Sequence, residues 1–122
     1  MSIAAILASA LVVQAPAPGE GAVEVAYPEM VAGRTSAAID KIEHADARDA
    51  AHPARLINLG IAYARMGEDE KARKLLSDAA ACNERYWLET ASGEWADARE
   101  VALKAIAKLD RGEFAGAQFA SR

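Results

Sequence analysis

Residues 53–81 read PARLINLGIAYARMGEDEKARKLLSDAAA, and this stretch decides the fold. Pro53 suits the first turn of a helix, where its missing N–H costs nothing. Apolar or small residues then follow at the spacing of one helical face: Leu56, Leu59, Gly60 and Tyr63. Gly67 interrupts this pattern and suits a helix C-terminus, because glycine readily adopts the left-handed conformation found there. The stretch therefore predicts a helix that ends close to Gly67.

A second helix is predicted directly after this glycine. Glu68, Asp69 and Glu70 begin it and basic residues follow, which is the order that the helix dipole favours. The apolar and small residues on its buried side are Ala72, Leu75, Leu76 and Ala79. Two helices joined by one tight turn form an antiparallel helical hairpin.

The spacing within this hairpin resembles the tetratricopeptide repeat. That family has leucine–glycine, an aromatic residue and glycine, and then alanine, a large apolar residue and alanine. The matching residues here are Leu59, Gly60, Tyr63, Gly67, Ala72, Leu76 and Ala79, with Leu56 where the family often has tryptophan. Glu84 stands where the family often has proline. The resemblance implies closely packed helix pairs that stack side by side.

Part of the pattern occurs again on both sides of this hairpin. Upstream, the same spacing is found at Gly33, Ala38, Ile42 and Ala45, one repeat of about 34 residues before Gly67. A weaker third copy at Gly93, Ala98, Ala102 and Ala105 follows too early for a full repeat. Asp97 is a suitable N-cap for the helix of this copy. The residues before it are aromatic and β-branched, and predict an extended segment or small hairpin near 85–95.

These patterns predict an all-α domain at 23–111, built as a short array of helical hairpins. The composition agrees, since the chain is 52% hydrophobic, only 6% aromatic and rich in alanine, which favours closely packed helices. Residues 112–122 contain two glycines and are expected to form a loose C-terminal tail.

The N-terminal residues predict either an export signal or a segment that docks on the domain. Residues 3–13 are apolar and uncharged, as in the core of a signal peptide, and are too few to span a bilayer. We place the signal peptide at 1–17 and a flexible spacer at 18–22. The protein is then expected in the periplasm, or in the cytoplasm if the leader is not a signal, with no integral membrane span.

The sequence offers no constellation for catalysis. A net charge of −4 argues against nucleic-acid binding, and the single cysteine, Cys82, excludes an intramolecular disulfide or a multi-cysteine metal site. His44 and His52 are expected in a solvated connection between helix pairs, at a spacing that matches no metal motif. We therefore predict no enzymatic activity, no cofactor and no metal. An enzyme or metal binder that uses these histidines is a distant third reading.

What remains is a surface for another protein. In the family that the chain resembles, the first helices of successive hairpins line a groove for a peptide or a partner helix. By resemblance, the groove residues here are Ile57, Asn58, Ile61, Ala64 and Arg65. The alternative for this face is packing on a neighbouring helix or on the N-terminal segment. Trp87 and Trp95 are expected either to anchor an interface or to close the core.

The predicted function is a non-catalytic protein–protein interaction module that binds a peptide or partner protein in a helical groove. The alternative is a structural protein that self-associates through its terminal hairpins, because a short repeat array exposes its ends.

Overall fold

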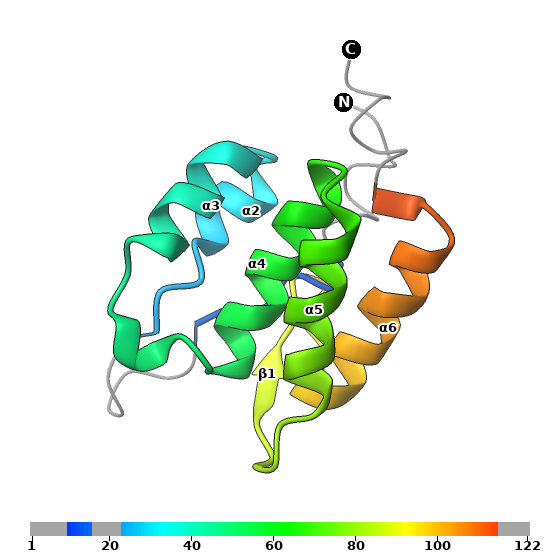
Figure 1. Cartoon of the computed structure of the whole chain (residues 1–122). Helices are drawn as coiled ribbons and strands as arrows, with labels where there is room; N and C mark the ends of the chain where they lie inside the picture. Colours follow the sequence, from blue (N-terminus) through cyan, green and yellow to red (C-terminus); the bar gives the residue numbers. More distant parts are fainter. Residues whose placement is uncertain (1–9, 16–22, 115–122) are drawn as a thin grey trace.

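The computed structural model describes residues 10–15 and 23–114, which are mostly helical with one small antiparallel sheet. The helices are α2 (Tyr27–Val31), α3 (Thr35–Glu43), α4 (Pro53–Arg65), α5 (Asp69–Ala80) and α6 (Ala98–Asp110), with a 3₁₀ turn at Ala47–Asp49. The strands β1 (Trp87–Glu89) and β2 (Trp95–Asp97) lie between α5 and α6 in the sequence. Helix α4 packs against α3, α5 and α6, and the central place of the α4–α5 pair is visible in Figure 1.

The α4–α5 hairpin confirms the two helices predicted from residues 53–81. Pro53 is the first residue of α4, and the Nδ1 atom of His52 caps the helix by accepting a hydrogen bond from the Ala54 backbone N–H at 3.1 Å. Gly67, with φ of +78°, makes the turn between the two helices. This left-handed conformation is strained for other residues, which explains the glycine.

The two helices approach each other most closely at Gly60. A Cβ atom at this position would lie 2.8 Å from Leu76 Cγ and 2.9 Å from Leu76 Cδ2. On the α5 side of the contact, Ala72, Leu76 and Ala79 are fully buried. The small residues therefore permit close packing, as the sequence predicted.

The α2–α3 pair has the same kind of bend. Gly33, with φ of +76°, separates these two helices as Gly67 separates α4 and α5. Ala38 and Ile42 of α3 are fully buried, and α3 packs against α4.

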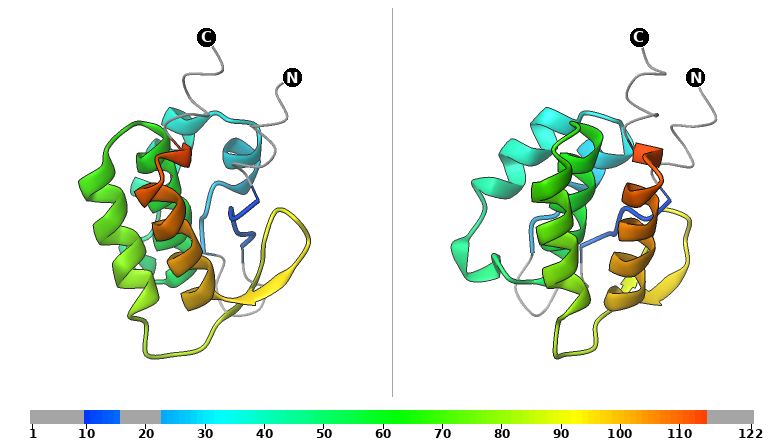
Figure 2. Two further views of the ribbon diagram at one scale, coloured as in Figure 1. Left: turned by 90° about the vertical axis from the view of Figure 1, so that its right-hand side faces the viewer. Right: turned by 45° about the vertical axis from the view of Figure 1, so that its right-hand side comes forward.

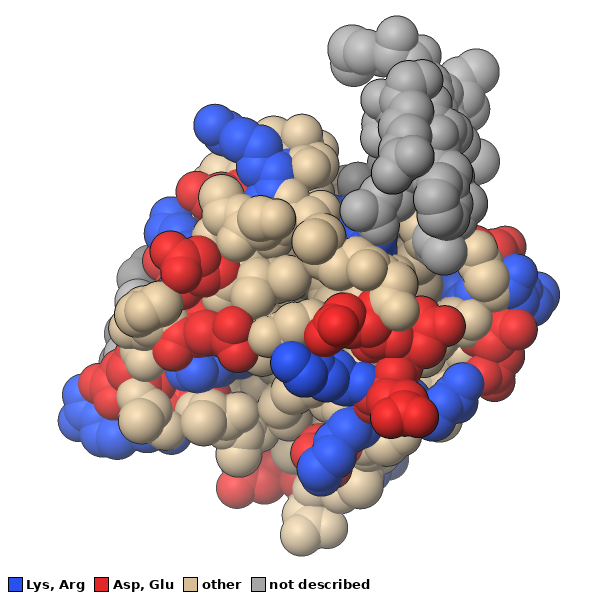
Figure 3. Space-filling view, turned by 45° about the horizontal axis from the view of Figure 1, so that its top comes forward, with Lys and Arg blue, Asp and Glu red and all other residues tan. Residues whose placement is uncertain are grey.

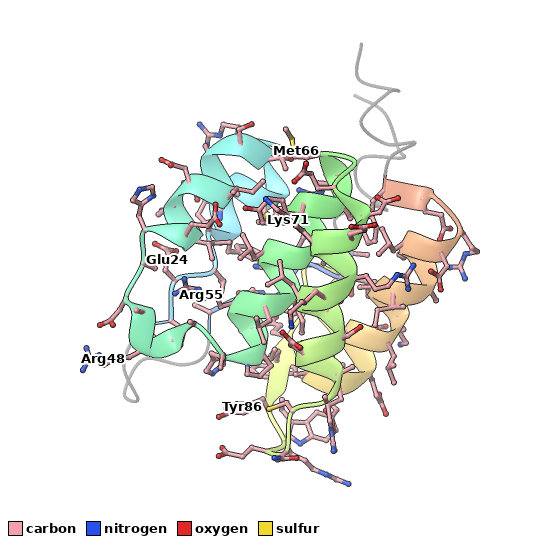
Figure 4. The ribbon with its side chains drawn as sticks, in the orientation of Figure 1. Glu24, Arg48, Arg55, Met66, Lys71 and Tyr86 are labelled. Carbon is pink, nitrogen blue, oxygen red and sulfur yellow. The ribbon has the colours of Figure 1, made fainter. Side chains whose placement is uncertain are left out.

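Tyr63 of α4 contacts both neighbouring helices. It forms a hydrogen bond with Glu43 of α3, and burial together with this bond raises the pKa of Tyr63 to about 12. The Nζ atom of Lys71, on α5, lies 5.1 Å from the centre of the Tyr63 ring (Figure 4). The aromatic residue of the repeat pattern thus links three helices.

The weaker third copy of the pattern is present only in its helix, since Ala98, Ala102 and Ala105 are buried on α6, and its glycine has another role. Gly93, with φ of +88°, lies in the turn of a β-hairpin, where its N–H donates to Thr90 O at 2.9 Å. The extended hairpin predicted near 85–95 is confirmed instead, as β1 and β2. Asp97 then caps α6, as predicted, because its Oδ1 accepts a hydrogen bond from the Arg99 backbone N–H at 2.9 Å.

Residues 12–14 lie beside the hairpin as an extended segment. Val13 and Thr90 form an antiparallel bridge, and Val12 and Val13 are fully buried. Figure 2 shows residues 10–15, in dark blue, between the yellow hairpin and the light blue segment before α2. Part of the predicted leader is therefore packed on the domain in this structure, whereas residues 1–9 and the predicted spacer lie outside the described residues.

One residue of the predicted C-terminal tail packs in the core. Phe114 is 1% exposed, whereas Gly112 and Glu113 before it are exposed, so the expectation of a loose tail is wrong for Phe114. Residues 115–122 lie outside the described part of the chain.

None of the helices in the described ranges is long and apolar enough to cross a bilayer. Acidic and basic side chains are interspersed over the face that Figure 3 presents.

Candidate functional site

The face of α4 that was predicted to form a groove is covered by the chain itself. The five predicted groove residues are between 0% and 7% exposed: Ile57, Asn58, Ile61, Ala64 and Arg65. The expectation of an open groove is therefore wrong, and the structure shows the alternative, packing on neighbouring helices and on the N-terminal segment. The physical reason is that a short helical array has few other surfaces against which to bury this apolar face.

Asn58 holds the N-terminal segment at its backbone. Its Nδ2 donates to Val13 O at 2.8 Å and to Val25 O at 2.9 Å, and its Oδ1 accepts from Val13 N at 2.8 Å. The side chain is fully buried, so an unpaired amide would carry a large desolvation cost. Both polar atoms of the Asn58 side chain therefore have hydrogen-bond partners in the backbone of Val13 and Val25.

Two buried arginines hold other parts of the chain against α4. Arg65 donates from Nη1 to Met30 O at 2.9 Å, and burial lowers the pKa of Arg65. Arg55 donates from Nη1 to Asp46 O at 2.9 Å (Figure 4). The predicted groove residue Arg65 thus anchors the end of α2 in this structure.

The two histidines lie in different environments. His44 is exposed, with Nδ1 3.3 Å from an oxygen of Asp40, as expected for a solvated connection. His52 is half-buried, and its ring centre lies 4.7 Å from that of Tyr86. Burial lowers the pKa of His52. The expectation of a solvated position is therefore wrong for His52, because this histidine caps α4.

No group of three or more His, Cys, Asp or Glu side chains is placed to hold a metal ion within residues 10–15 and 23–114. Cys82 is half-buried just beyond the end of α5. These positions bring together no nucleophile and base among the residues that the sequence singled out.

The most exposed large apolar side chains of the described residues lie on the β1–β2 hairpin. Trp87 is 60% exposed and Trp95 is 63% exposed. The two indoles are the only tryptophans of the chain. We call the outward side of the hairpin, formed by Trp87, Glu89 and Trp95, the indole face.

The strand register explains why both indoles point outward. Trp87 pairs with Asp97, and Glu89 pairs with Trp95. Because side chains alternate between the two faces of a strand, these four residues share one side and the pair Leu88 and Ala96 takes the other. Leu88 is 2% exposed, so the second side faces the core.

An ion pair borders the indole face at the start of α6. Arg99 Nη2 lies 3.1 Å from Asp97 Oδ2, and the side-chain hydrogen bond from Arg99 lowers the pKa of Asp97. The side chain of Asp97 is largely buried, whereas about a third of the Arg99 side chain is exposed. The border of the face therefore carries a partly exposed arginine that is paired with Asp97.

Sequence reasoning named the two tryptophans but did not settle their orientation. Three apolar residues follow one another here, Tyr86, Trp87 and Leu88. Without alternation of apolar and polar residues, the sequence does not show which side chains face the core. A buried indole was the more frequent outcome for a chain with few bulky residues. The turn at Gly93 supplies the register that local hydrophobicity lacks.

No family model, no curated protein and no solved structure matches the chain. The function has to be inferred from the contacts described above.

Proposed function

We propose that this protein is a small, non-catalytic protein-binding module of the tetratricopeptide type, and that it contacts its partner through the indole face. The observation that carries the proposal is the exposure of Trp87 and Trp95 on the same side of one hairpin. The equivalent bends at Gly33 and Gly67 and the close contact at Gly60 support the repeat-like arrangement of the helices.

The energetic argument concerns the area that two indoles leave in water. A tryptophan side chain can bury about 150–250 Å², and most of this area is exposed at both positions. Tryptophan is enriched among the residues that dominate binding energy at protein interfaces. The indole face therefore suits a partner surface with apolar side chains, bordered by an acceptor for Arg99.

The proposed site differs from the groove of the sequence prediction. The groove face of α4 already contacts residues 12–14, whereas the outward side of the hairpin contacts solvent. Partner binding at the indole face needs no rearrangement of the described core.

The proposal is tested by affinity capture from the native host. The double variant Trp87→Ala/Trp95→Ala should retain at most about a tenth of the partner captured by the wild type, since each interface tryptophan contributes about 2 kcal/mol. Leu103→Ala is the matched control, because Leu103 is an apolar residue on α6 that is 58% exposed. Equal capture by wild type and double variant would place the partner elsewhere.

Self-association is the second candidate function. Val31 and Met66, both 42% exposed, lie at the ends of α2 and α4, where one helix pair could meet another copy. Molecular mass measured across a dilution series separates the two functions. A dimer that dissociates on Val31→Ala but not on Trp87→Ala/Trp95→Ala would favour assembly over the binding of a different protein.

A further inference from the structure

The indole face carries one acidic side chain beside its two tryptophans. Glu89 pairs with Trp95 across the hairpin, and Glu89 is partly exposed. Within residues 10–15 and 23–114, the Glu89 carboxylate has no hydrogen bond and no ion pair. We propose that the indole face binds an arginine side chain of the partner, whose guanidinium group stacks on the Trp95 indole and donates hydrogen bonds to Glu89. This arginine site rests on the proposed function, because it assigns the chemistry of the partner at the same face.

The hydrogen bonds of the hairpin place Glu89 and Trp95 close together. Thr90 N donates to Glu94 O at 2.8 Å, so the next pair, Glu89 and Trp95, is of the non-hydrogen-bonded kind. Opposite side chains are closest in such a pair. Trp87 is the diagonal neighbour of Trp95, at a separation that long aromatic side chains can bridge. A flat cationic group can therefore contact an indole and the carboxylate together.

Neither indole has a cation or a second aromatic ring on its face within the described parts of the chain. The ring pair found there is His52 with Tyr86, and the cation–ring contact is Lys71 with Tyr63. The face of an indole carries negative electrostatic potential and attracts cations. The surface beside Glu89 is therefore complementary to positive charge.

The two ends of the indole face differ in charge. At one end, Arg99 Nη2 lies 3.1 Å from Asp97 Oδ2, so this carboxylate already has its cation. Hydrogen bonds from Arg99, followed by the charges of Arg99 and Arg85, lower the pKa of Asp97. At the other end, the Glu89 carboxylate lies opposite Trp95. A cationic side chain of the partner therefore fits the end formed by Glu89 and Trp95.

The chemistry of this end favours arginine over lysine. A guanidinium group is planar, stacks on aromatic rings and donates two parallel hydrogen bonds to a carboxylate. An ammonium group is compact and more strongly hydrated, so it gains less from a partly exposed ring. The aliphatic stem of arginine also covers apolar ring surface. Arginine can thus use both the indole of Trp95 and the carboxylate of Glu89.

The direct test is an NMR titration of the full chain that follows the indole Nε1–H signals of Trp87 and Trp95. The probe is a glycine–arginine–glycine tripeptide blocked at both ends, and the matched probes carry citrulline, lysine or glutamate at the centre. Citrulline has nearly the shape of arginine but no charge. We expect saturable shifts with the arginine probe, and binding at least about fivefold weaker with citrulline and about twofold weaker with lysine.

Two matched pairs of variants assign the contacts. Glu89→Gln should weaken binding of the arginine probe about fivefold, because the charge-assisted hydrogen bonds are lost. Glu70→Gln, the same change at an exposed residue of α5, should leave binding unchanged. Trp95→Leu should weaken binding more than Trp87→Leu, since Trp95 is the indole opposite Glu89. The signal of the remaining tryptophan shows whether each of these two variants is folded.

Four results would overturn the proposal. The first is the absence of any saturable shift with the arginine probe. The second is equally tight binding of the citrulline or the lysine probe. The third is tighter binding of the glutamate probe, which would make the face a site for anions. The fourth is unchanged affinity of the Glu89→Gln variant for the arginine probe.

Affinity capture from the native host separates failure of the arginine site from failure of the proposed function. We expect Glu89→Gln to capture about a fifth of the partner captured by the wild type, which is more than Trp87→Ala/Trp95→Ala captures. Full capture by Glu89→Gln together with loss in the tryptophan variant would leave the indole face as the binding site, without an arginine contact. Full capture by both variants would overturn the proposed function as well.

Discussion

At the scale of single residues, the packing of α4 against α5 depends on the lack of a side chain at Gly60. Gly60 lies inside a helix, where glycine normally costs about 1 kcal/mol relative to alanine. The space for a side chain at this position is filled by Leu76, which is fully buried and cannot move away freely. The close approach of α4 and α5 therefore outweighs helix propensity at this position.

Gly60→Ala should lower the free energy of unfolding by about 1–3 kcal/mol, because the added Cβ overlaps the Leu76 side chain. Gly67→Ala is the comparison, since nothing lies within 4 Å of a Cβ there and its penalty comes from the backbone conformation alone. Urea unfolding gives both values. In addition, Gly67→Asn should be milder than Gly67→Ala, because asparagine tolerates the left-handed conformation. A stabilised Gly60→Ala variant would refute the close contact.

His52 should make stability depend on pH. Burial lowers its pKa below the ordinary value of 6.5, so the unfolded chain binds a proton at this residue more readily than the folded chain. The stability that neutral His52 supplies is therefore fully present above about pH 6.5 and is lost as the pH falls through the lowered pKa. Protonation of Nδ1 also removes the acceptor for the Ala54 N–H.

The measurement is the difference in unfolding free energy between about pH 7 and pH 5. His52→Ser keeps a capping oxygen but does not titrate, so it should lose less stability over this range than the wild type. His44→Ser, at an exposed position, should behave like the wild type. An identical pH dependence of the wild type and His52→Ser would show that the cap does not depend on neutral histidine.

At the scale of elements, the helices could be predicted because their signals are local. Proline at the start, glycine at the bend and apolar spacing all act within one hairpin, and α4 and α5 follow them closely. The hairpin of β1 and β2 was expected only in outline, because local pattern does not fix its register. The cover of the α4 face could not be predicted, since Val13 and Asn58 are 45 residues apart in sequence.

The strand register predicts that replacing Leu88 by alanine costs more stability than replacing either tryptophan. Residue size alone would predict the opposite order. Leu88→Ala should cost about 2–4 kcal/mol, because Leu88 is buried and its loss leaves a cavity. Trp87→Ala and Trp95→Ala should each cost less than about 1 kcal/mol, since both indoles are mostly in water. Thermal or urea unfolding of the three variants decides the matter. A larger loss at either tryptophan than at Leu88 would mean that the two faces of the hairpin are exchanged.

At the scale of the whole molecule, one helical frame carries an exposed face and a covered one. The indole face is exposed, whereas the Asn58 side of α4 is covered by residues 12–14, which belong to the predicted leader. If residues 1–17 are removed on export, as a signal peptide would be, Asn58 and the backbone of residues 89–91 lose their hydrogen bonds to this segment. One of these bonds joins Gln14 N to Glu89 O, so the loss reaches the strand that carries the indole face.

The strongest test of the account is site-specific photo-crosslinking in the native host at Glu89, which pairs with Trp95 and shares the indole face with Trp87. The control places the same crosslinker at Ser77, an exposed residue of α5. The account predicts one dominant adduct with another protein at Glu89, none at Ser77, and loss of that adduct in the Trp87→Ala/Trp95→Ala background. Equal labelling at both positions, or an adduct that survives loss of both tryptophans, would contradict it.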